Sequence, residues 1–122
     1  MEPKLPQRTE KPWGYELLVA LTPQYAGKVI FVKKGQRLSL QYHRKKDESS
    51  YVIQGKLVLE TEGTDGNLME FTFNQGERFH TPPMTKHRVK ALEDTTLFEV
   101  STPELDDVVR LADDYGRQID TK

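Results

Sequence analysis

Short apolar runs separated by turn-forming residues recur along most of the chain. They lie at 17–21, 28–33, 37–43, 51–53, 57–61, 69–73, 89–92 and 96–101. Runs of this length, bounded by glycine, asparagine or proline, favour β-strands over helices. The runs 51–53 and 57–61 are separated by little more than Gly55, so we expect them to form a hairpin.

One segment, 103–115, has the spacing of an amphipathic helix. Its apolar residues could form a single stripe, and they are Leu105, Val108, Val109 and Ala112. Thr102 suits the N-cap of such a helix, and Pro103 suits its first turn. Many short strands followed by one helix predict an all-β fold, a small antiparallel β-barrel or jelly roll with one C-terminal helix packed outside.

The length of 122 residues fits a single domain. We expect residues 1–12 to form an irregular N-terminal arm, because they contain three prolines and scattered charge. The domain would then span 13–117, including the helix, and 118–122 would form a tail.

Composition excludes several classes of partner. The formal net charge is −1, which favours neither nucleic acid nor a membrane surface. No apolar stretch resembles a signal peptide or a membrane span. The chain has no cysteine, so thiolate chemistry and disulfides are excluded, and we expect a cytoplasmic location.

Potential metal ligands gather around the run 37–43. Alternation along a strand puts Arg37, Ser39, Gln41 and His43 on one face. Glu48 follows across an expected bend, and we expect His87 to enter the same pocket from the opposite wall. Two imidazoles, a carboxylate and an amide oxygen suit one divalent transition metal ion, namely Zn, Mn, Fe, Ni or Co.

Each histidine taken alone indicates no more than a hydrogen-bonded structural residue, and only the combination favours a metal site. The neighbouring basic run 44–46 is typical of a solvated loop.

Two spaced motifs resemble those of the cupin superfamily. The first is a glycine, five residues, His-x-His, a glutamate and a second glycine, and the matching positions here are Gly35, Gln41, His43, Glu48 and Gly55. The second runs from a glycine through Pro-x-Gly to a histidine and an asparagine, and the matching positions are Gly76, Pro82, Met84, His87 and Ala91. Gln41 replaces the first histidine, while Met84 and Ala91 depart from the usual glycine and asparagine.

From about residue 11 to about residue 117 the chain resembles the cupin domain of type II mannose-6-phosphate isomerases, chiefly in 11–16, 38–43 and 105–117. The resemblance implies a metal-dependent aldose–ketose isomerase of carbohydrate metabolism that acts on a phosphorylated sugar. It also implies a tail arginine near the site, so Arg110 and Arg117 become candidate catalytic residues. Arg37 and Ser39 become candidate substrate-binding residues. The alternative for the two tail arginines is a structural role near a helix C-terminus.

Two other functions stay open. A cupin oxygenase or lyase could use the same site on a small organic acid, and a non-catalytic module could bind a sugar or a metal. An antiparallel fold of this size exposes sheet edges, and the arm from Leu5 to Gly14 could pair with a second copy. We therefore expect a homodimer.

Overall fold

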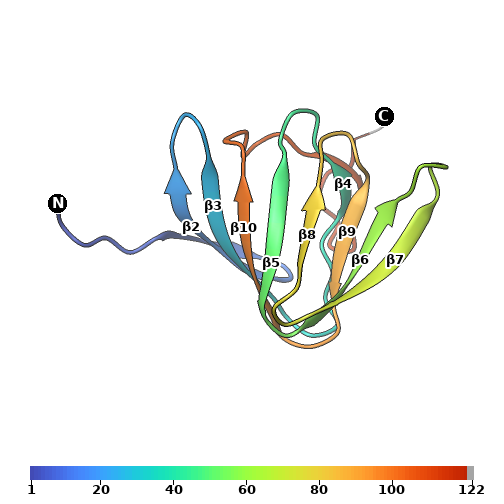
Figure 1. The fold of residues 1–122 in the computed structure, drawn as a ribbon, viewed down its shortest axis with the longest axis horizontal. Helices are drawn as coiled ribbons and strands as arrows, with labels where there is room; N and C mark the ends of the chain where they lie inside the picture. Colours follow the sequence, from blue (N-terminus) through green and yellow to red (C-terminus); the bar gives the residue numbers. More distant parts are fainter. Residues whose placement is uncertain (121–122) are drawn as a thin grey trace.

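The structure, a computed structural model, describes residues 1–120 as two antiparallel sheets that face each other (Figure 1). The larger sheet has the order β1 (Gln7–Lys11), β2 (Gly14–Leu21), β3 (Ala26–Val32), β10 (Thr95–Ser101), β5 (Glu48–Gln54) and β8 (Arg78–Thr81). The smaller sheet has the order β11 (Val109–Ala112), β4 (Leu40–Tyr42), β9 (His87–Ala91), β6 (Lys56–Glu62) and β7 (Leu68–Asn74). The predicted all-β jelly roll is confirmed, although the two sheets do not join into one closed barrel.

The space between the sheets has an apolar layer and a polar layer. In β10, Leu97 and Glu99 both point inward, and they pair with Val52 and Ser50 of β5. Leu97 and Val52 belong to the buried apolar core, together with Trp13, Ile30, Val32, Leu57, Leu59, Phe79, Val89 and Ala91. Glu99 and Ser50 are also buried, but they lie one row closer to Glu48. The same alternation that builds the core therefore lines one end of the sandwich with polar groups.

The connection at Gly55 is not a hairpin, because β5 and β6 belong to different sheets. Gly55 has a φ of 100°, and a Cβ there would lie 2.5 Å from the carbonyl oxygen of Asp94. Only glycine can make this close turn. The chain bends there from the larger sheet to the smaller one, and β6 pairs with β7 and β9 instead.

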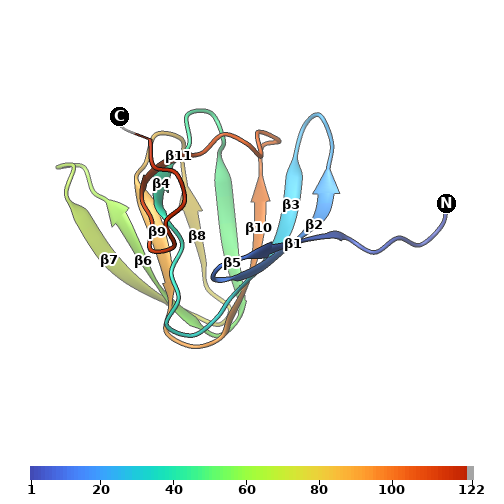
Figure 2. The ribbon, with the colours of Figure 1, turned by 180° about the vertical axis from the view of Figure 1, so that it is seen from behind.

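The expected helix over 103–115 is wrong. Residues 102–108 form an irregular connection, and Val109–Ala112 forms β11, which pairs with β4 (Figure 2). Tertiary hydrogen bonds explain the difference, since Thr102, the expected N-cap, exchanges two with Asp47. A short segment gains more from such partners than from helix propensity. Within residues 1–120 there is no helix that could span a membrane.

The N-terminal arm is only partly irregular. Gln7–Lys11 forms β1, which pairs with β2 along its full length. Residues before it project away from the body (Figure 1), and Leu5 is 95% exposed.

At the C-terminal end, Asp120 forms two hydrogen bonds with the backbone of Arg110, so part of the predicted tail packs against β11. Residues 121–122 of that tail lie outside the described part of the chain.

Candidate metal centre

His43, Glu48 and His87 come together at the polar end of the sandwich. One potential ligand atom from each lies within 4.8 Å of the others, and all three side chains are buried. His43 directly follows β4 and His87 begins the neighbouring strand β9, whereas Glu48 begins β5 in the facing sheet. The expectation that His87 enters from the opposite wall is wrong, since Gln41 and His87 are cross-strand partners. Glu48 is the group that closes the cluster from across the pocket.

Backbone carbonyls orient both imidazole rings. His43 Nδ1 lies 2.6 Å from the carbonyl oxygen of Asp107, and His87 Nδ1 lies 2.9 Å from that of Thr85. A carbonyl can only accept, so each Nδ1 carries a proton and donates it. Both Nε2 atoms then face Glu48 Oε1, at 3.2 and 3.3 Å. Two inward imidazole nitrogens beside a carboxylate oxygen fit a divalent metal ion, because ligating histidines usually donate their other N–H in this way.

The cluster favours a negative charge on Glu48. Burial alone would raise the pKa of this carboxyl, but His43, His87 and the Lys46 ammonium hold it well below its usual range. Burial would likewise lower the pKa of His43, yet the facing Glu48 carboxylate raises it. A metal ion would take the place of the proton on Nε2, so metal binding and proton release are linked at this site.

Lys46 is buried beside the cluster, contrary to the expected solvated loop. Its side chain is 5% exposed, and its Nζ lies 3.0 Å from Glu48 Oε2 and 3.2 Å from Glu99 Oε2. The contact with Glu48 is an ion pair rather than a well-directed hydrogen bond. These carboxylates raise the pKa of Lys46 against the opposing effect of burial. Burial, together with the nearby charge of Glu48, raises the pKa of Glu99 to about 8.

Ser39 and Gln41 line the same cavity as His43 and Glu48. The Ser39 hydroxyl donates a hydrogen bond of 2.7 Å to Gln41 Oε1, which fixes the amide orientation. The structure therefore brings Gln41 to the site through its pairing with His87, while its role as a fourth ligand stays a prediction.

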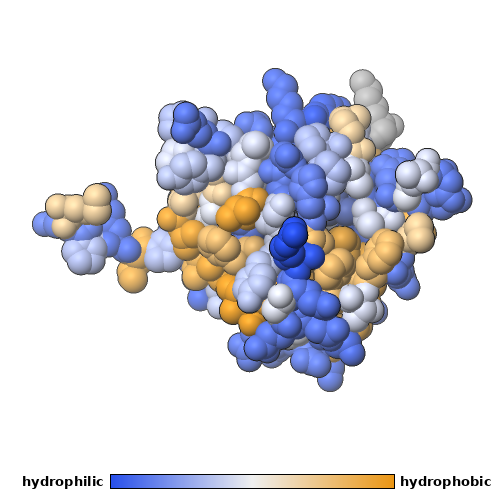
Figure 3. All heavy atoms as spheres, in the orientation of Figure 1, coloured by the Kyte–Doolittle hydropathy of each residue, from blue (hydrophilic) through white to orange (hydrophobic). Residues whose placement is uncertain are grey.

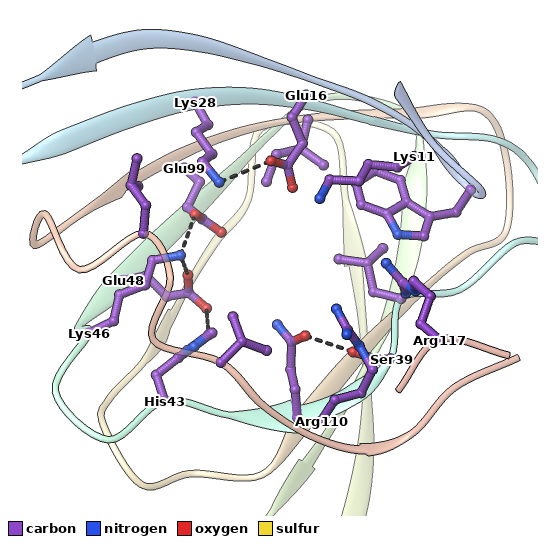
Figure 4. Close-up of a pocket in the computed structure, with 16 residues that line it drawn as sticks. Lys11, Glu16, Lys28, Ser39, His43, Lys46, Glu48, Glu99, Arg110 and Arg117 are labelled. Atoms are coloured by element: carbon purple, nitrogen blue, oxygen red, sulfur yellow. Dashed lines mark hydrogen bonds and ion pairs between the residues drawn. The ribbon is translucent and has the colours of Figure 1, made fainter. Parts of the chain in front are cut away.

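Arg110 and Arg117 both line the cavity on the side away from Glu48 and Glu99 (Figure 4). Arg117 donates three hydrogen bonds of 2.7–3.2 Å to the Asp113 carboxylate, so its charge is already paired. Arg110 differs, because its buried Nε has no hydrogen-bond partner among residues 1–120. Of the two predicted tail arginines, only Arg117 forms an ion pair with a carboxylate among residues 1–120.

Arg37 does not reach the metal cavity. Its guanidinium forms two hydrogen bonds with Asp114 and lines a separate cavity on the outside of the smaller sheet. The predicted alternation fails here because β4 begins only at Leu40, and Leu38 and Ser39 both line the inner cavity. The placement of Arg37 beside Gln41 and His43 is therefore corrected.

The larger sheet contributes a polar wall that we did not predict. Lys28 Nζ donates a 2.9 Å hydrogen bond to Glu16, and Lys28 is the cross-strand partner of Glu99. All three side chains line the cavity. Their strands carry apolar residues on both faces, so the alternation pattern alone did not identify the inward side.

Known structures share this fold. The structure of KdgF from Halomonas sp. is 24% identical, with a TM-score of 0.70, and the match covers 82% of this chain and 88% of that one. Oxalate decarboxylase from Bacillus subtilis is 19% identical with a TM-score of 0.75, over 87% of this chain and 30% of that one. The capsular polysaccharide assembling protein CapF from Staphylococcus aureus is 19% identical with a TM-score of 0.75, over 91% of this chain and 34% of that one. The chain thus spans about a third of the latter two proteins, and at these identities the likeness shows the cupin fold alone.

No curated protein sequence is significantly similar to the chain. A family model described as mannose-6-phosphate isomerase C-terminal matches residues 2–113, which include the whole His-Glu-His cluster and Arg110. The chain therefore belongs to the mannose-6-phosphate isomerase C-terminal family.

Proposed function

We propose that this protein is a metal-dependent aldose–ketose isomerase whose substrate is a phosphorylated sugar similar to mannose 6-phosphate. The observation that supports this most directly is a row of three residues across neighbouring strands. Arg110 pairs with Gln41, and Gln41 pairs with His87. Neighbouring strands lie about 4.8 Å apart, so the backbone positions of Arg110 and His87 stand roughly 10 Å apart along one wall.

This arrangement suits a small substrate with a phosphate at one end and reacting oxygens at the other. The isomerisation moves one proton between C1 and C2 of the open-chain sugar and another between the oxygens on these carbons. A metal ion at the cluster would supply Lewis-acid stabilisation of the charge that develops. Arg110 would hold the phosphate through its bidentate guanidinium. The hydroxyl groups between the two ends would meet Ser39 and the Lys28–Glu16 pair, which offer both donors and acceptors.

A second candidate is a lyase or oxygenase that acts on a small organic acid. The same free guanidinium favours it, because a carboxylate presents the same two-oxygen edge to arginine as a phosphate does. A non-catalytic module that binds a sugar or metal is the third candidate. The three differ in turnover, so one set of assays separates them.

The test begins with elemental analysis of protein purified without added metal. The protein, loaded with the metal found, is then assayed with mannose 6-phosphate, unphosphorylated mannose and a panel of small carboxylic acids. We expect conversion of the phosphorylated sugar alone, and its loss in a His43→Ala, His87→Ala double variant. Turnover of an acid, or oxygen uptake, would favour the second candidate. Tight binding without turnover of any compound would favour the third.

We further propose that the protein forms a homodimer through the outer face of the larger sheet. Figure 3 shows apolar side chains across this face, and the exposed large ones on β2, β5 and β10 are Val19, Leu21, Tyr51, Ile53 and Val100. The projecting arm before β1, with its exposed Leu5, could extend the contact onto a second copy. Light scattering after size exclusion should give about twice the 14.1 kDa of one chain. A species of 14.1 kDa at all concentrations would refute the dimer.

The lack of cysteine agrees with a reducing compartment, and we propose that the protein works in the cytoplasm. Fractionation of the source cells would test this.

A further inference from the structure

The two oxygens of the Glu48 carboxylate face different partners. Oε1 lies 3.2 Å from His43 Nε2 and 3.3 Å from His87 Nε2. Oε2 lies on the other side, 3.0 Å from the ammonium of Lys46. With its side chain only 6% exposed, Glu48 has almost no contact with solvent, so these three neighbours and the nearby Glu99 carboxyl decide how the carboxylate is turned.

The Lys46 side chain is held at both of its ends. At the backbone, its N–H donates a 2.9 Å hydrogen bond to Asp107 Oδ2, and the next residue, Asp47, is tied to Thr102. At the tip, Nζ also donates to Glu99 Oε2 at 3.2 Å. A long side chain fixed in this way defines one position for its charge, in contrast to a lysine on a solvated loop.

We propose that Lys46 is a positioning residue that reserves Oε2 of Glu48, so that the carboxylate offers only Oε1 to a metal ion held by His43 and His87. This inference rests on the metal binding of the proposed function, although not on isomerase activity. A carboxylate can bind a metal through one oxygen or two. A glutamate limited to one oxygen leaves more of the coordination sphere open, and an open position is what a catalytic metal site needs.

The effect on affinity separates this role from a merely structural one. Residues that support a ligand by hydrogen bonding usually increase metal affinity, and their loss lowers it. Lys46 is a buried cation, so it also repels a metal ion and competes with it for the charge of Glu48. Its replacement by an apolar residue should free Oε2, remove this repulsion and tighten metal binding.

The experiment uses Co²⁺ as a spectroscopic probe in the full-length protein freed of metal. In Lys46→Met, we expect Co²⁺ to bind about tenfold more tightly, with a weaker visible absorption band because the coordination number rises. Glu99→Gln is the matched control, because it alters the other partner of Lys46 and leaves the ion pair with Glu48 in place. It should keep the wild-type band.

Lys46→Met removes the cation beside the buried Glu48 carboxylate and the buried Glu99 carboxyl, so a Lys46→Met, Glu99→Met double variant supplies a second test if the single variant does not fold. It should show the same weaker band. Weaker Co²⁺ binding with an unchanged band in either variant, or an equal change in Glu99→Gln, would overturn the role of Lys46. Failure of the wild type to bind Co²⁺ would overturn the metal site as well. A change in the band without any isomerase activity would support the role of Lys46 and refute only the proposed reaction.

Discussion

His43 donates its Nδ1 proton to the main-chain carbonyl of Asp107, over a distance of 2.6 Å. The carboxylate of the same aspartate accepts hydrogen bonds of 2.6–3.0 Å from the backbone N–H groups of the basic run 44–46. One residue from the C-terminal connection thus fixes both a ring of the candidate metal site and the loop between His43 and Glu48. The three N–H groups hold the pKa of the Asp107 carboxyl below its usual value, although its partial burial opposes this.

Replacement of Asp107 by alanine should therefore loosen the loop that carries two of the three cluster residues. We expect the free energy of unfolding to fall by about 2 kcal/mol, the usual cost of losing charge-assisted hydrogen bonds of this kind. Metal affinity should fall roughly tenfold or more. Denaturant unfolding and metal titration would measure both quantities. Asp106→Ala, at the exposed neighbouring position, is the control, and an equal effect in that variant would contradict the assignment.

Replacement of Arg110 by methionine should weaken the binding of the phosphate. Because the guanidinium would contact only the anionic end of the proposed substrate, KM should rise about tenfold or more, with a smaller change in kcat. Steady-state kinetics of the metal-loaded protein would measure this. Arg44→Met, on the exposed part of the loop, should leave KM unchanged. An unaltered KM in Arg110→Met would place the anion site elsewhere.

Met84 occupies a backbone conformation that favours glycine. Its φ is 64°, and it is the one non-glycine residue with a positive φ between residues 1 and 120. Its side chain is 60% exposed, so little packing would be lost. Met84→Gly should raise the free energy of unfolding by up to about 1 kcal/mol, since relief of strain exceeds the added entropy of the unfolded chain.

The reverse substitution provides the control for Met84. Gly76 has a φ of 89° and open space around it, so Gly76→Ala should lower stability by about 1 kcal/mol through strain alone. Thermal unfolding of both variants would measure the two effects. Equal melting temperatures for Met84→Gly and the wild type would show that the strain at this position is negligible.

The Asp113–Arg117 ion pair should make the free energy of unfolding decrease as the pH is lowered into the acid range. Hydrogen bonds from Arg117 lower the pKa of the Asp113 carboxyl from 3.8 to about 2 in the folded protein. The unfolded chain then binds more protons than the native one between about pH 4 and pH 2. The contribution of this pair is fully present above about pH 4 and declines as pH falls towards the folded pKa. Unfolding free energies across this range should fall less steeply for Arg117→Met than for the wild type, and parallel curves would refute the linkage.

The sequence was sufficient for the fold class and for the three residues of the His-Glu-His cluster, because both depend on local spacing. Strand alternation and glycine positions mark the β-runs, and the spacing from His43 to Glu48 fits within one loop. The sequence alone did not predict which strands pair with each other. Gly55 could close a hairpin or carry the chain to the other sheet, and the choice depends on which strands β5 and β6 pair with. In the structure β5 and β6 lie in different sheets, and Gly55 packs closely against the backbone of Asp94.

Long-range partners explain the remaining differences. The spacing of apolar residues over 103–115 is typical of a helix. The segment instead forms backbone hydrogen bonds with the edge of β4, and its Asp107 carboxylate accepts hydrogen bonds from the N–H groups of the loop 44–46. The basic run 44–46 predicts a solvated loop, but Lys46 is buried because its ammonium lies between two acidic side chains, Glu48 of β5 and Glu99 of β10. Arg37 does not share the inward face of Gln41 and His43, because β4 begins only at Leu40, three residues after Arg37. In each case a partner distant in sequence overrode the local pattern.

The interior has an apolar layer and a polar layer, so the residues that stabilise the fold differ from those that line the polar end of the cavity. Leu97 and Val52 belong to the apolar core, while Glu99 and Ser50, two residues away on the same strands, form part of the polar layer. Substitutions in the polar layer can change the chemistry of the cavity while the apolar core stays filled. A fold organised in this way can exchange one chemistry for another while its scaffold persists.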